Sequence, residues 1–102
     1  MSIGASLPFR PAGTASIAAS TSAAAVALVG GGSSVLVFNA ASGIAFVRFG
    51  MSGVVATAGS DLPVPSGGRV LVDAGRLATY ASAVLGSGTG SVFFTRGDGS
   101  VY

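Results

Sequence analysis

Two dense apolar segments, residues 35–38 and 44–49, flank a short polar corner and set the pattern of the chain. Both segments consist mainly of β-branched and aromatic residues, which suit the pleated surface of a β-strand. The corner has the length of a four- or five-residue hairpin loop, and its Asn39 and Gly43 are residue types that adopt positive φ angles. We therefore predict a β-hairpin over residues 35–50.

The second of these strands is apolar on both of its faces. Alternation along a strand places Ile44 and Phe46 on one face together with Arg48. Val47 and Phe49 lie on the opposite face. Because a small domain covers only one face of a strand with its core, we expect a loop, an arm or another subunit to cover the other face. We predict that Phe46 is the core aromatic, since it shares its face with the large Ile44.

Short apolar segments recur along the chain, separated by Gly, Ser, Pro and Asp. Further strands are expected at residues 14–19, 23–29, 54–57, 69–73, 78–85 and 91–95. Residues 58–68 form the one long loop, because Pro63 and Pro65 bar it from the interior of a sheet. The regular spacing without a long helix predicts an all-β fold, a β-sandwich or jelly-roll-like domain of about eight short strands over residues 14–102. An up-and-down barrel is the alternative.

The first residues, 1–13, differ from the rest of the chain in their prolines. Pro8 and Pro11 exclude both a helix and a central strand, so we expect an extended N-terminal arm. Its apolar anchors are Ile3, Leu7 and Phe9. A solvated tail does not need such anchors, and we therefore expect the arm to dock on a neighbouring molecule rather than to fray.

The composition favours self-association. Half of the residues are hydrophobic, the mean hydropathy is +0.78, and only 8% are charged, which is about a third of the usual share. A lone monomer with so few charges risks precipitation, so we expect an oligomer. The net charge of +2 comes from scattered arginines without lysine, which is not the clustered charge that nucleic acids require. We therefore expect protein partners and no nucleic acid.

The chain lacks the side chains on which most catalysis depends. It has no His, Cys, Glu or Lys, which removes the common general bases, thiol nucleophiles and most metal ligands. Asp61, Asp73 and Asp98 are expected to cap turns. The glycine-rich runs lack the lysine and helix of a phosphate-binding loop. We expect no enzyme activity, cofactor, metal or small-molecule substrate, and we interpret the Arg-Gly-Asp sequence at residues 96–98 as part of a turn.

Residues 12–32 are rich in alanine and follow an arginine, which superficially suggests a membrane segment. The segment also contains several Ser and Thr and few large aliphatic residues. A bilayer span needs about 20 strongly apolar residues. We therefore do not expect a membrane partner.

Several motifs resemble those of small structural proteins from the virions of tailed bacteriophages. They are Asn39, Ser42, Gly43, the run 46–50, the run 55–57, the loop 60–65 and the turn 97–99. The resemblance covers residues 35–99 and carries no catalytic residue. It implies a capsid decoration or cement protein, made in the host cytoplasm, that binds the major capsid protein lattice on the capsid surface. Three-fold lattice positions then favour a homotrimer.

The candidate partner contacts combine the arm with apolar or charged side chains of the strands and the long loop. They are Ile3, Leu7, Phe9, Arg10, Arg48, Phe49, Leu62 and Val64. Arg48 is either an edge-strand charge that blocks aggregation or an interface arginine. Leu62 and Val64 pack either inward as a lid or outward onto a partner. The alternative functions are a tail or neck protein of the virion and a receptor- or carbohydrate-binding β-module.

Overall fold

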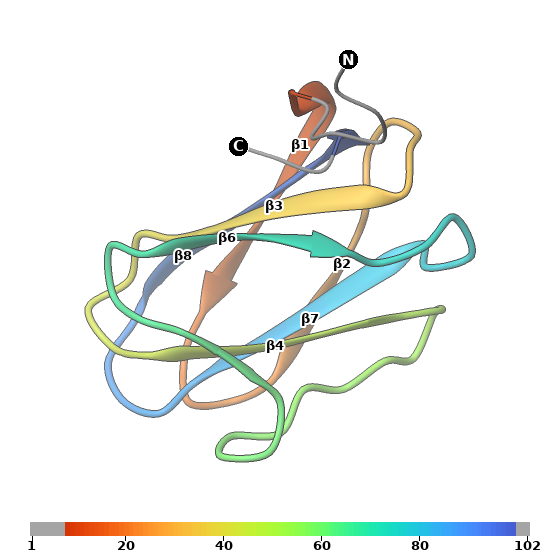
Figure 1. The fold of residues 1–102 in the computed structure, drawn as a ribbon. Helices are drawn as coiled ribbons and strands as arrows, with labels where there is room; N and C mark the ends of the chain where they lie inside the picture. The colour runs from red at the N-terminus through yellow and green to blue at the C-terminus, as the bar shows by residue number, and fades with distance from the viewer. Residues whose placement is uncertain (1–7, 100–102) are drawn as a thin grey trace.

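The computed structural model describes residues 8–99, which form two antiparallel four-stranded sheets packed face to face (Figure 1). The strands are β1 (Arg10–Ala19), β2 (Ala24–Ala27), β3 (Ser34–Asn39), β4 (Ala45–Gly50), β5 (Leu62–Val64), β6 (Arg69–Asp73), β7 (Tyr80–Leu85) and β8 (Gly90–Asp98). One sheet has the order β1-β8-β3-β6 and the other β2-β7-β4-β5. The predicted all-β sandwich of about eight short strands is confirmed.

The strand pairing is nested. β1 pairs with β8, β2 with β7, β3 with β6, and β4 with β5, each pair antiparallel. With the exception of β4 and β5, strands that follow each other in the chain lie in opposite sheets. Most loops therefore cross from one layer to the other at an end of the sandwich.

The predicted hairpin over residues 35–50 is wrong. β3 pairs with β6 and β8, whereas β4 pairs with β5 and β7 in the other sheet. The corner at residues 40–44 joins the two layers, so the inward side chains of the two strands face each other across the core. Val37 and Val47 belong to the same buried cluster. Local composition is the same for a hairpin and for such a corner, because both need two apolar strands and a polar connection.

Asn39 holds this corner through its side chain and not through a positive φ angle. Within residues 8–99 no residue other than glycine has a positive φ, and Gly43 is not among the glycines that do. The fully buried Asn39 amide donates from Nδ2 to the carbonyl oxygens of Gly43 and Val64, at 2.8 and 2.9 Å, and its Oδ1 accepts from the Ala41 N–H. All the polar atoms of this buried side chain are thus bonded, and the corner is tied to β5.

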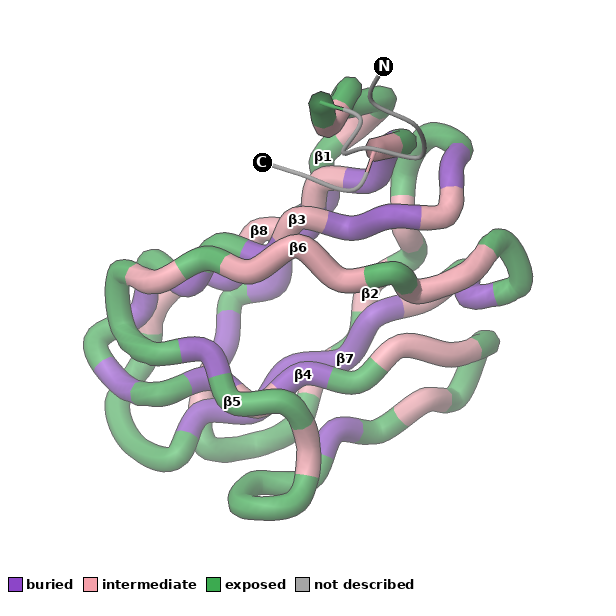
Figure 2. Tube along the Cα trace, viewed as in Figure 1, coloured by how far each residue is buried: buried purple, intermediate pink, exposed green. Residues whose placement is uncertain are grey.

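The core lies between the sheets, whose strands carry the buried segments (Figure 2). It consists mainly of Ala and Val, with a few larger side chains. Phe94 on β8 is completely buried, and the Phe49 ring packs edge-on against it with 6.0 Å between centroids. Phe46 lies on the outer face of β4, on the same side as Arg48. The prediction of Phe46 as the core aromatic is therefore wrong, because the exposed Arg48 fixes the outward face of the strand.

Two other expected elements differ from the structure. Residues 54–57 are not a strand, and β5 lies at 62–64, inside the segment expected to be a loop. Pro63 is compatible with β5 because β5 is the outermost strand of its sheet, where one side needs no N–H donor.

The first strand begins earlier than predicted, at Arg10 rather than at residue 14. Residues 1–7 of the expected arm lie outside the described residues, whereas Arg10 to Gly13 pair with the end of β8. Pro11 is tolerated because β1 is an outer strand, and the pairing shifts register between Pro11 and Gly13. The boundary between arm and sandwich therefore does not fall at residue 13.

Candidate binding surface

The aspartates serve local structure in the described part of the chain. Asp61 accepts from Arg48 Nε at 2.9 Å and from the Thr57 N–H at 2.6 Å. Asp73 accepts from the Gly75 N–H, and Asp98 from the Ser33 N–H. Within residues 8–99 no group of three or more potential metal ligands lies together. These carboxylates thus stabilise turns and loops, as expected from the sequence.

An open hollow of ≈ 520 Å³ lies at the end of the sandwich where the described chain begins and ends. Its described lining consists of Arg10, Ser33, Ser34, Leu71, Asp73, Asp98 and Gly99. Small-molecule sites are mostly apolar, whereas Leu71 is the one large apolar side chain among these described residues. Both aspartates already accept backbone hydrogen bonds. The described part of the lining therefore does not favour a small-molecule site.

The middle of the outer face of the β2-β7-β4-β5 sheet, at β7, is covered by the chain itself. Residues 51–61 lie across it and bring Ala56 onto Ser82 of β7, which is completely buried. Ser82 Oγ accepts from the Ala56 N–H at 2.9 Å and donates to the Ala24 carbonyl at 2.8 Å. At the end of this segment, the ion pair between Arg48 and Asp61 connects it to β4. We expected a loop, an arm or another subunit to cover the second face of β4, and the structure shows a loop. The two apolar faces of β4 therefore do not require a second subunit.

Ser82→Ala is expected to lower the free energy of unfolding by about 1–2 kcal/mol, because the buried Ala56 N–H loses its acceptor. We expect faster amide hydrogen exchange in residues 51–61 as well. Ser52→Ala, an exposed change in the same loop, is the matched control and should change stability by less than about 0.5 kcal/mol. Unchanged exchange at Ala56 in the Ser82 variant would contradict this role.

The outer face of the β1-β8-β3-β6 sheet carries a group of large apolar side chains, here called the Phe38 face. It consists of Leu36, Phe38, Leu71 and Phe93. The Phe38 and Phe93 rings are stacked with 6.3 Å between centroids and 22° between planes. Leu36 lies opposite Leu71 in register. Phe38 is 38% exposed and the other three are half-buried, in contrast to the covered middle of the other sheet's outer face.

Polar side chains border the Phe38 face on both sides. Arg69 lies opposite Phe38 on the outermost strand β6, and Asp73 follows on the same face. On the β1 side, the exposed Thr14 and Ser16 lie opposite Thr95 and Phe93, and the two threonine hydroxyls are hydrogen-bonded. An apolar centre with a polar border is the usual composition of a protein interface.

The structure does not bring the candidate contacts from the sequence together. Ile3 and Leu7 lie outside the described residues. Phe49 and Val64 are directed into the sandwich, where Val64 is 1% exposed and the half-buried Phe49 packs against the core cluster. Of the inward and outward alternatives for the long loop, Val64 takes the inward one.

The remaining candidates are spread over the molecule. Leu62 is 39% exposed at the edge of its sheet, and Arg48 is exposed but paired with Asp61. Arg10 is exposed at the start of β1, and Phe9 beside it is half-buried. Sequence reasoning did not select the residues of the Phe38 face. The signal was present in β3, where apolar side chains occupy both alternating positions, but without the sheet order it did not indicate which face was left open.

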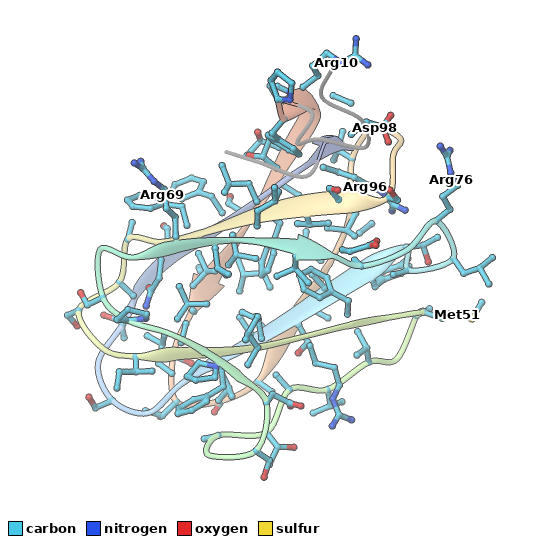
Figure 3. All side chains as sticks on the ribbon, in the orientation of Figure 1. Arg10, Met51, Arg69, Arg76, Arg96 and Asp98 are labelled. Atoms are coloured by element: carbon cyan, nitrogen blue, oxygen red, sulfur yellow. The ribbon has the colours of Figure 1, made fainter. Side chains whose placement is uncertain are left out.

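The arginine of the Arg-Gly-Asp sequence is a structural residue. β8 extends to Asp98, and Arg96 is 5% exposed within it. Its guanidinium donates to the carbonyl oxygens of Gly32, Ala78, Gly75 and Arg76 at 2.5 to 3.2 Å. Figure 3 shows Arg96 directed into the molecule, whereas Arg76 projects away from it. Arg96 thus joins the β2–β3 and β6–β7 loops and is not displayed as an adhesion motif.

Comparisons of the chain with protein-family models, with curated proteins and with solved structures found no match. Residues 8–99 hold no helix with the length and apolar character needed to cross a membrane. What the chain binds is therefore inferred from its own surface, and the Phe38 face is the candidate.

Proposed function

We propose that this chain is a non-enzymatic structural protein of a tailed-bacteriophage virion. In this proposal it is a decoration or cement protein that is made in the host cytoplasm and binds the major capsid protein lattice on the outside of the capsid. It also binds itself, with a trimer favoured by the three-fold positions of such lattices. The surface that contacts the capsid is the Phe38 face.

The observation that carries the proposal is the grouping of large apolar side chains on the outer face of one sheet. Two stacked aromatic rings and two leucines occupy the outer side of one sheet, while residues 51–61 cover the middle of the corresponding side of the other sheet. Exposed apolar groups with a polar border are typical of protein-binding surfaces. Large aromatic side chains provide much of the affinity in such contacts.

Two further features support a structural role. The resemblance of residues 35–99 to small virion proteins rests on turn and core positions, and the nested pairing of eight strands in two sheets is compatible with the jelly-roll-like interpretation. A cement protein also needs only a modest interface, because many copies acting on one shell add their contributions.

Phe38→Ser is expected to reduce binding to capsids about tenfold or more, because it removes half of the stacked aromatic pair from the surface while the buried side of β3 is unchanged. Leu77→Ser is the matched control, since Leu77 is 86% exposed in the β6–β7 loop and is not part of a strand of this sheet. Co-sedimentation of each variant with capsids stripped of the native protein measures the effect. Equal binding by both variants would contradict the assignment of the surface.

The position in the particle provides the second test. We expect density for the sandwich at repeated positions on the outer capsid surface of the virion, with the Phe38 face toward the shell. Density at the tail or neck would overturn the decoration role and support the alternative place in the virion. Absence of the protein from purified particles would overturn both.

A further inference from the structure

β6 is an outermost strand that has exposed charges at its two ends, Arg69 and Asp73, but none of the other features that usually protect such an edge. Natural proteins protect sheet edges with charged side chains, prolines, bulges or very short strands. β5 has only three residues and contains a proline, β2 has four residues, and β1 carries a proline and a register shift. β6 is a regular five-residue strand, Arg-Val-Leu-Val-Asp, in register with β3 along its whole length.

The backbone N–H and C=O groups of successive β6 residues are directed alternately toward β3 and toward the open side of the sheet. The Asn39 N–H donates to the Gly68 carbonyl, and the Ala74 N–H donates to the Ser33 carbonyl, both at 2.9 Å. In an antiparallel pair, hydrogen-bonded and non-hydrogen-bonded positions alternate, so these flanking bonds place Val70 and Val72 at the positions bonded to β3. The backbone N–H and C=O groups of Arg69, Leu71 and Asp73 are therefore directed away from β3.

Burial along β6 indicates that this edge is incompletely covered. Val70 and Val72 pack against the core cluster but remain half-buried, as the pink tube in Figure 2 shows. Their register partners on β3, Val37 and Val35, are 0% exposed. The difference follows from position, because β3 has a strand on both sides and β6 has one on a single side.

We propose that β6 pairs antiparallel with β6 of a second copy of this chain, about a two-fold axis at Leu71. In this register Leu71 lies opposite Leu71 of the second copy, and Arg69 lies opposite Asp73 of the second copy. These are the positions whose backbone groups are directed outward, so each pair exchanges both backbone hydrogen bonds. The opposite charges at the two ends of the strand make the edge complementary to itself only in the antiparallel direction.

The pairing also extends the apolar face. Leu36 lies opposite Leu71 within one copy, so the two-fold axis produces a row of leucines that runs across both copies. Its ends are bounded by the paired Arg69 and Asp73. The contact uses a strand edge and leaves the faces of both sheets available, and it therefore does not depend on the virion role or on a trimer.

Two opposite charge variants test the pairing. Arg69→Asp makes both ends of β6 acidic, and Asp73→Arg makes both ends basic, so each variant alone places like charges opposite each other. We expect each variant to self-associate about tenfold more weakly than the native chain. An equimolar mixture restores opposite charges at every pair and should associate at least tenfold more tightly than either variant alone, as measured by analytical ultracentrifugation with one variant labelled. A mixture that associates no better than the separate variants would overturn the proposal.

A cysteine variant gives a second measurement that does not alter the charges. Leu71→Cys places two thiols at the axis, where Cα atoms about 5.5 Å apart lie within the disulfide range of about 4.4–6.8 Å. Since the native chain has no cysteine, oxidation should convert most of this variant to a covalent dimer. Ser16→Cys, exposed on β1 of the same sheet, is the control and should remain uncrosslinked. Equal crosslinking rates for the two variants would show random collision and overturn the proposal.

Discussion

Replacing Arg96 by methionine should lower the free energy of unfolding by about 2–6 kcal/mol, because two buried carbonyl oxygens lose their donors at about 1–3 kcal/mol each. The buried guanidinium donates to carbonyl oxygens from two separate loops. Methionine fills a similar volume but donates nothing, so the inner carbonyls of Gly32 and Ala78 lose their hydrogen bonds in a site that excludes water.

The loss of local stability should be largest in the two loops that Arg96 connects. Faster hydrogen exchange is expected in residues 30–33 and 74–79, together with the lower midpoint in chemical denaturation. Arg96→Lys should recover only part of the stability, because an ammonium group lacks the planar fork that reaches both loops. Arg76→Met is the matched control, since Arg76 is exposed, and should change stability by less than about 0.5 kcal/mol. Equal effects at Arg76 and Arg96 would exclude the bridging role.

Phe94→Ala should lower the free energy of unfolding by about 3–5 kcal/mol, because transfer free energy is lost and a cavity remains. Phe94 is among the largest fully buried side chains, and its ring contacts the edge-on ring of Phe49. The surrounding core is built mainly from Ala and Val on β-strands. Small side chains on hydrogen-bonded strands have little freedom to move into the space, so we expect a cost near the upper end of this range.

Phe93→Ala provides a control on the neighbouring residue of the same strand. Phe93 faces outward and is half-buried on the Phe38 face, so its removal leaves no internal cavity and should cost less than about 1.5 kcal/mol. Thermal and urea denaturation of both variants measure the difference. If the two changes cost the same, the side chains of β8 would not divide into a core face and an outer face.

The sequence patterns located the strands better than they located the strands' partners. Apolar β-branched and aromatic residues mark β3 and β4 because strand conformation depends on local side chains. Whether the next strand lies in the same sheet depends on a corner whose key residue, Asn39, bonds to Val64 in a distant part of the chain. Such a contact has no local signature, so the corner was interpreted as a hairpin.

The position of Arg48 is enough to predict which face of β4 is directed outward. Alternation places Phe46 and Arg48 on one face of β4, and an arginine without a buried partner belongs in water. The opposite case is Arg96, whose burial is possible only because the carbonyls of two distant loops converge on it. Prediction of the Phe38 face also requires the order of the strands in the sheet. Apolar side chains at alternating positions occur both on strands whose outer face is covered and on strands whose outer face is open.

The nested pairing also determines when the protein can fold during its synthesis. β8 lies between β1 and β3, and β7 lies between β2 and β4, so the strands that complete both sheets are synthesised after the strands that they join. Until then β1 and β2 have no neighbour within their sheets, and the long separation between partners, such as Arg10 and Asp98, slows the closing step. A growing chain therefore exposes its apolar strands until β7 and β8 have been synthesised, and contact with other chains during this time carries a risk of aggregation.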